Sequence, residues 1–234
     1  MEFPIDNNTI YYARLPAKKD LSLNGNHFTY NHNSVSNKRS IKDSLKHCWY
    51  SEFTNRGWVE IINPRPVINV GAGDFTFECW FKTNYFDYQG LFSKYQDGNN
   101  FFSWRIGSLR RLELECKIGG VIVQRAFTNL GIFNYSELVH VAMISNRITG
   151  NTIYVNLTPV GLAANVFGAG NITNTGSCLI GIWRIIPAPI YPLMGNIYEI
   201  RISNKARSLQ ELTIFHNYTR SHINKIYPHS SEIN

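Results

Sequence analysis

The feature that most constrains this fold is the alternation of apolar and polar residues in FTFECWFK, residues 75–82. A period of two over eight residues predicts a β-strand with one face buried in a core. The expected buried set is Phe75, Phe77, Cys79 and Phe81. Trp80 falls on the polar side of this strand, so we expect it to pack under a neighbouring strand or loop.

Similar short runs recur along the chain, separated by Gly, Pro and Asn turn signals. They cover 57–62, 90–95, 101–106, 112–118, 121–127, 138–145, 152–158, 177–183 and 196–203. Gly119 and Gly120 join two of these runs and predict a tight hairpin. Short strands with no helices between them predict an all-β fold: an antiparallel two-sheet β-sandwich of the jelly-roll type.

One short C-terminal helix is expected in SLQELTIFHNY, residues 208–218. Ser208 and Glu211 have the spacing of a capping box, and Leu209, Leu212 and Phe215 form an apolar stripe. The polar residues 219–234 are predicted to be a tail. With 234 residues and no linker, the chain is predicted to hold one domain over 9–218, preceded by an extension over 1–8.

Charge and cysteine usage restrict the partners. The net charge of +7 favours anionic partners such as acidic glycans. No helical reader or stacking motif accompanies the charge, so we expect no specific nucleic-acid binding. The four cysteines lack metal-binding spacing. Cys79 and Cys116 are expected in the core as thiols, although a Cys79–Cys116 bridge stays open if their strands face each other.

No apolar stretch is long enough to span a membrane, and residues 1–16 contain no apolar core of a secretory signal. We therefore expect synthesis without a leader in a reducing compartment.

Five motifs in order resemble the laminin-G-like, concanavalin A-like jelly-roll family. They are DLSLNGNHFTY (20–30), GWVEIINPRPVINVGAGDFTFECWFK (57–82), LVHVAMI (138–144), IYVNLTPVG (153–161) and GNIYEIRISNKARSLQEL (195–212). Leu23, Leu157 and Tyr198 replace residues usual in the family pattern. The resemblance implies a concanavalin A-like sandwich that binds glycans or proteins on its rim loops or on its concave sheet.

Glu113 and Glu115 are the nearest match to the paired carboxylates of jelly-roll glycosidases. Leu114 stands between them where those enzymes carry an Asp, and Lys117 continues the polar face. We therefore expect a solvated strand face and no catalysis. His140, within a family-like strand, is expected to be structural.

No cofactor is expected, with one alternative left open. Asp20, Asn24 and Glu199 offer the oxygen ligands of a structural calcium ion, and Asp97 with Asn99 offers a second loop cluster. The alternative for each loop is an ordinary Asx turn.

Aromatic residues in loops and strands are the candidate binding residues. The candidates for carbohydrate or partner binding are Tyr85, Tyr88, Tyr95, Trp104, Trp183, Arg184 and Tyr191. Sugar rings pack their C–H faces on aromatic planes, while Tyr, Trp and Arg are equally the usual anchors of protein interfaces. The proline-rich loop 187–192 reduces the entropic cost of holding such a surface.

The leading hypothesis is a non-catalytic module on the surface of a virus or phage particle, such as a capsid decoration or fibre protein. It would bind other virion or surface proteins, host glycans, and in an oligomer further copies of itself. The alternatives are a bacterial carbohydrate-binding module or adhesin, extracellular or on the cell surface, and a glycoside hydrolase with an atypical site.

Overall fold

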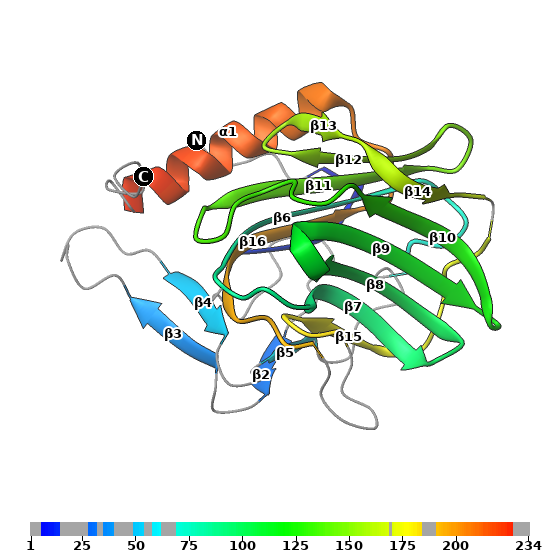
Figure 1. Cartoon of the computed structure of the whole chain (residues 1–234), viewed down its shortest axis with the longest axis horizontal. Coiled ribbons are helices and arrows are strands. Elements are labelled where there is room, and N and C mark those ends of the chain that lie inside the picture. The colour runs from blue at the N-terminus through cyan, green and yellow to red at the C-terminus, as the bar shows by residue number, and fades with distance from the viewer. Residues whose placement is uncertain are drawn as a thin grey trace.

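The computed structural model describes residues 6–14, 28–31, 35–39, 49–53, 58–61, 69–168, 170–183 and 191–226. Two antiparallel sheets face each other across one core, as the sequence predicted (Figure 1). Each predicted run contains a strand of the structure. The strands β1, β2, β3, β4 and β14 were not predicted, because their segments lack a sustained apolar alternation.

The first sheet has the order β13-β12-β11-β6-β16-β4-β3, and β1 pairs with β16. Its strands are β13 (Thr158–Val160), β12 (Gly150–Val155), β11 (Val139–Asn146), β6 (Phe75–Thr83), β16 (Gly195–Ser203), β4 (Trp49–Phe53), β3 (Val35–Arg39) and β1 (Thr9–Arg14).

The second sheet has the order β14-β10-β9-β8-β7-β15-β5-β2. Its strands are β14 (Leu162–Val166), β10 (Val121–Thr128), β9 (Arg111–Ile118), β8 (Asn100–Gly107), β7 (Gln89–Asp97), β15 (Ser177–Ile180), β5 (Trp58–Ile61) and β2 (Phe28–Asn31). A single 3-10 turn, η2 (Ser108–Arg110), connects β8 to β9.

The core lies between the two sheets and is rich in aromatic rings. All four residues of the predicted buried set on β6 are 0% exposed. The ring centroid of Phe77 lies 4.7 Å from that of Trp104 and 5.0 Å from that of Phe92, both on the second sheet. Burial of such rings is the main source of stability in a sandwich of this kind.

The buried thiols settle the question of a disulfide within the described residues. Cys79 and Cys116 carry free thiols and are completely buried, so the Cys79–Cys116 bridge that the sequence left open does not form, and Cys178 is buried in the same core. They act as small apolar core residues. Cys48 lies outside the described residues.

The helix α1 (Leu209–Ile226) covers the side of the first sheet that faces away from the core (Figure 1). Its start is as predicted: Ser208 N–H donates to Glu211 Oε2 at 2.9 Å, and Glu211 N–H donates to Ser208 Oγ at 3.3 Å. Its end is not, because the helix continues through the first eight residues of the predicted tail. Thr219 and Ile223 are buried and extend the stripe of Leu212 and Phe215 onto the sheet.

Trp80 packs under this helix, which explains an aromatic ring on the polar side of β6. Its indole Nε1 donates to Thr219 Oγ1 at 2.6 Å, and the ring clusters with Tyr198, Phe215 and Ile223. Tyr198, which departs from the family pattern, therefore faces the helix. Among the described segments, no helix combines the length and the apolar character needed to cross a bilayer.

Candidate functional site

Three of the predicted aromatic residues converge at one margin of the second sheet. Tyr88 comes from the loop between β6 and β7, Trp183 follows β15, and Tyr191 precedes β16. The rings of Trp183 and Tyr191 are stacked, with centroids 5.4 Å apart and planes 20° apart. Tyr88 lies 5.0 Å from Tyr191. All three are half-buried and keep part of their surface open to solvent. We call Tyr88, Trp183 and Tyr191 the aromatic platform.

Backbone contacts with β7 hold the platform in place. Gly90 N–H donates to the Tyr191 carbonyl at 2.8 Å, and Gly181 N–H donates to the Leu91 carbonyl at 3.1 Å. Tyr191 has a φ of 54°, a left-handed conformation that is costly for a residue with a side chain. Gly90 permits the close approach, since a Cβ there would lie less than 3.0 Å from the Ile182 backbone.

Arg105 of β8 joins the platform to the outer face of the second sheet. Its guanidinium carbon lies 5.1 Å from the Trp183 ring centroid and 5.9 Å from that of Tyr88, within the range of cation–π attraction. Its Nε donates to Glu113 Oε2 at 2.7 Å. Glu113 is 1% exposed and also accepts two hydrogen bonds from Arg111.

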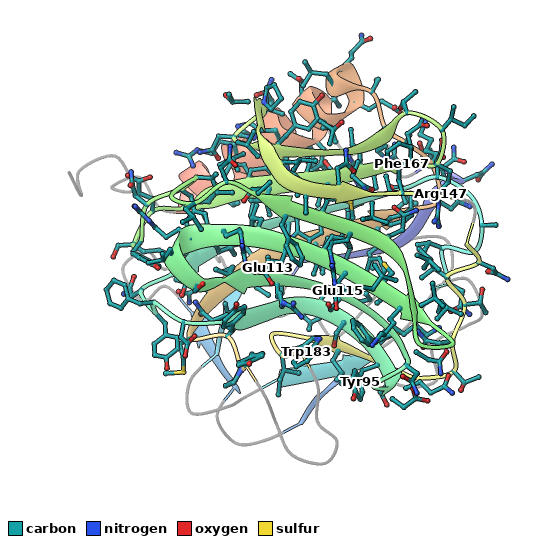
Figure 2. All side chains as sticks on the ribbon, turned by 45° about the vertical axis from the view of Figure 1, so that its right-hand side comes forward. Tyr95, Glu113, Glu115, Arg147, Phe167 and Trp183 are labelled. Carbon is teal, nitrogen blue, oxygen red and sulfur yellow. The ribbon has the colours of Figure 1, made fainter. Side chains whose placement is uncertain are left out.

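The polar surface continues across β9 and β10. Glu115 Oε2 accepts from Nε and Nη2 of Arg125 at 3.1 and 2.9 Å. The guanidinium carbons of Arg111 and Arg125 lie 5.0 and 5.3 Å from the centroid of Phe127. Figure 2 shows Glu113, Glu115 and Trp183 on the same face of the second sheet.

Glu113 and Glu115 share this outer face, as their spacing predicted. Each carboxylate is bound by arginine: Glu113 by Arg105 and Arg111, and Glu115 by Arg125. An acid–nucleophile pair needs one carboxyl group that can give up a proton and one free to attack. In this structure both carboxylates of the pair are instead engaged by guanidinium groups.

The other predicted residues lie elsewhere. Tyr95 is buried, with 8% of its surface exposed, and packs against the platform: its ring centroid lies 6.3 Å from that of Trp183. Trp104 is 1% exposed in the core, so the candidate set is corrected by removing it. Its neighbours Phe102 and Ile106 share the inner face of β8, which turns Trp104 inward. Tyr85 is 45% exposed on the same loop as Tyr88. Arg184 lies outside the described residues.

The contribution of Arg105 was missed. The signal was present in FFSWRI, residues 101–106, because an inward Trp104 requires its neighbour Arg105 to point outward. Periodicity alone does not say whether Trp104 or Arg105 faces the core, because that choice depends on which side of the sheet the core lies.

Of the two loop clusters proposed to bind calcium, the one at Asp97 lies within the described residues and forms a turn. Asp97 accepts from Asn99 N–H at 2.7 Å and from Asn100 Nδ2 at 3.1 Å, as in an Asx turn. These hydrogen bonds lower the pKa of Asp97. Glu199 is buried, whereas Asp20 and Asn24 lie outside the described residues. Over the described part of the chain, no three His, Cys, Asp or Glu side chains gather as a metal site.

His140 lies far from this surface, completely buried beneath α1. Its ring centroid is 5.0 Å from those of Trp80 and His216, and burial holds its pKa well below the usual value. The surroundings fit the structural role that the sequence predicted.

The sequence profile of the family described as the concanavalin A-like lectin/glucanases superfamily matches residues 53–213. Among curated proteins there is no significant sequence match.

Solved structures show the same fold at low identity. The binding domain of Paraclostridial Mosquitocidal Protein 1 and that of botulinum neurotoxin serotype D/C VPI 5993 each superpose with a TM-score of 0.68 and 14% identity. In both cases 92% of this chain covers 53% of the other. A third structure, of botulinum neurotoxin type C, is described with cell entry that depends on two ganglioside molecules. It superposes with a TM-score of 0.65 and 14% identity, and the match covers 91% of this chain and 51% of the other. This chain thus spans about half of each.

Proposed function

The chain belongs to the concanavalin A-like lectin/glucanase superfamily, and from that premise we propose that it is a carbohydrate-binding module whose ligand sits on the aromatic platform. The observation that carries the proposal is the stack of Trp183 on Tyr191, with Tyr88 beside it and Arg105 in cation–π contact with Trp183 and Tyr88. Aromatic faces carry partial negative charge and attract the C–H faces of sugar rings. Arg105 adds a hydrogen-bond donor at the platform margin.

The platform is organised before any ligand arrives. The Gly90–Tyr191 hydrogen bond fixes the loop backbone, and Glu113 fixes Arg105. A surface that loses little freedom on binding keeps more of its contact energy as affinity. The exposed parts of three rings at one margin are also unusual for a surface with no partner.

We propose binding without catalysis. Glu113 and Glu115 are the paired carboxylates nearest to the platform, and both are bound by arginine. If the chain released reducing ends from a polysaccharide, and Glu113→Gln or Glu115→Gln abolished that release, this part of the proposal would be wrong.

The similar structures support a binding role without identifying the ligand. They are binding domains of toxins, and one is described with ganglioside interaction. Those chains are about twice as long as the region matched, so their ligands need not occupy the part that corresponds to this chain.

The setting of the protein stays a prediction. The matched structures come from toxins and lend the virion hypothesis no support, and a cell-surface or extracellular adhesin fits the same site. Mass spectrometry of purified particles and of membrane fractions separates the two settings: enrichment in particles would favour the virion component.

A glycan array followed by calorimetry tests the binding site. We expect Trp183→Ala and Tyr88→Ala each to weaken binding about tenfold or more, since a central aromatic anchor contributes about 2 kcal/mol. Phe86→Ala is the matched control, because Phe86 is 70% exposed on the same loop but outside the platform. Urea midpoints check that each variant is folded.

Two results would contradict the proposal. One is a folded protein that binds no glycan across plant, bacterial and animal polysaccharides. The other is equal loss of binding in Phe86→Ala and Trp183→Ala, which would place the ligand on the loop tip instead.

A further inference from the structure

We propose that the saccharide bound by this surface is acidic, and that Arg111 and Arg125 bind its carboxylate or sulfate beside Phe127. This inference rests on the proposed function and adds the chemical class of the ligand and a second contact region. We call Arg111, Arg125 and Phe127 the arginine pair site.

The charge of the outer face is the first argument. The ionisable side chains on the outward positions of β8, β9 and β10 are Arg105, Arg111, Lys117 and Arg125 against Glu113 and Glu115. Cations therefore outnumber carboxylates. Glu113 is buried and shared between two arginines, so it does not neutralise both. The surface that an incoming ligand meets is positive.

The geometry of the two guanidinium groups is the second argument. Both bind their glutamates through Nε and Nη2, which lie along one edge of the planar group. The edge carrying Nη1 points away from the glutamate and can meet an oxyanion. Arg111 is 25% exposed and Arg125 is 32% exposed, so each side chain is held in place while part of it stays open to solvent.

Phe127 provides the third argument, because the guanidinium carbons of Arg111 and Arg125 lie 5.0 and 5.3 Å from its ring centroid, within the range of cation–π contact. Cation–π contact holds the two cations near one ring despite their mutual repulsion. The glutamates orient them from the sheet. Such an arrangement concentrates positive charge in one place without burying it, which suits a charged group carried by a polymer.

The register of the second sheet connects this site to the platform. Arg105 pairs with Glu113, and Glu113 pairs with Phe127, so the three lie in one row across β8, β9 and β10. With neighbouring strands about 4.8 Å apart, Phe127 lies about 10 Å from Arg105, roughly two sugar units along an extended chain. A ligand that stacks on the platform thus reaches the arginine pair site by running across the strands.

Binding to three defined oligosaccharides by calorimetry tests the inference. Hyaluronan oligosaccharides carry carboxylates only, chondroitin sulfate adds sulfate groups, and fully acetylated chitooligosaccharides are neutral. We expect tighter binding of at least one acidic ligand than of the neutral one, and weaker binding as salt rises. Arg111→Gln and Arg125→Gln should each weaken acidic binding about tenfold and leave neutral binding unchanged.

Arg110→Gln is the matched control, because it removes the same charge one residue away. Arg110 donates to Asn134 Oδ1 and stacks near Tyr135, outside the arginine pair site. Arg125→Gln is the cleaner variant, since its partner Glu115 is partly exposed, whereas Glu113 is buried. Urea midpoints of the variants identify any loss of folding.

The outcomes separate this inference from the proposed function. Neutral binding that requires Trp183 but ignores Arg111 and Arg125 would overturn the inference and leave the proposed function intact. Equal weakening by Arg110→Gln would also overturn it, since only net charge would then matter. No binding of any glycan would overturn both.

Discussion

Single side chains decide whether the aromatic platform can form. Gly90 lies where β7 approaches Ile182 and Trp183 so closely that no Cβ fits, and Gly107 leaves room for the buried carboxylate of Glu113. The space beside Gly90 is bounded by backbone atoms, which cannot move aside, whereas the space beside Gly107 is bounded by the Glu113 side chain. The two glycines therefore differ in how much a substitution costs.

Replacing Gly90 by alanine should both destabilise the protein and weaken ligand binding. The added methyl group would overlap the Ile182 backbone and push Trp183 away from Tyr191. We expect a loss of about 2–4 kcal/mol in the free energy of unfolding, measured by urea denaturation. Gly98→Ala is the control: nothing lies within 4 Å of its Cβ position, so a change of more than about 0.5 kcal/mol there would undermine the steric explanation.

At the scale of elements, α1 depends on buried ionisable groups beneath it. Glu78 of β6 forms an ion pair with Arg201 of β16 at 2.5 Å, and Glu78 Oε1 lies 3.8 Å from His140 Nε2 of β11. His216 on the helix packs against the His140 ring. Arg220 of the helix and Arg207 before it add positive charge to the same region. The helix is thus docked over groups whose charges change with pH.

Acidification should loosen this helix. Burial lowers the pKa of His140 well below its usual value, and burial lowers that of His216 to about 4. The unfolded chain then binds these protons first, so stability falls as the pH drops below about 6.5. Burial raises the pKa of Glu78, and this shift makes stability rise as the pH falls. We expect the two histidines to outweigh this single carboxyl group.

Urea midpoints at pH 7 and pH 5 measure this effect, and hydrogen exchange of α1 amides localises it. We expect a lower midpoint at pH 5 and faster exchange in α1 than in β6. His140→Phe should reduce the pH dependence, because an apolar ring of similar size replaces the titrating one. A wild-type midpoint that does not change between the two pH values would refute the explanation.

At the scale of the whole molecule, the two sheets enclose a core that solvent does not reach. Cys79, Cys116 and Cys178 lie in it from both sheets, and each is 0% exposed. Burial raises the pKa of the Cys79 thiol, and that of Cys116 well above its usual value. The reactive thiolate is therefore scarce as well as inaccessible.

Alkylation should report the opening of this core. In native protein we expect iodoacetamide to label these three cysteines only as fast as the molecule unfolds, and in urea to label all three within minutes. Peptide mapping by mass spectrometry assigns the modified positions. Rapid labelling of Cys116 in protein with an unchanged circular dichroism spectrum would show that the sheets separate without unfolding.

Most of the fold was accessible from local pattern. The alternation in residues 75–82 indicated which residues of β6 are buried, and the turn signals located the hairpins. The end of α1 was not accessible, because Thr219 reads as polar and becomes a buried contact only when Trp80 donates to it. The same holds for Arg105, whose outward position follows from the location of the core.

The sequence by itself determined most of the strands, the buried residues of β6 and the membership of the family, since these depend on period-two burial and on motifs that are local in the chain. Only the tertiary structure decided which aromatic side chains meet. Tyr88 and Tyr191 are about a hundred residues apart and become neighbours because β7 bonds to the segment before β16. Trp104 and Trp183 are each followed by an arginine in the sequence, yet the structure buries Trp104 in the core and leaves Trp183 partly exposed at the surface. Periodicity assigns a side chain to a face, and only packing determines what that face contacts.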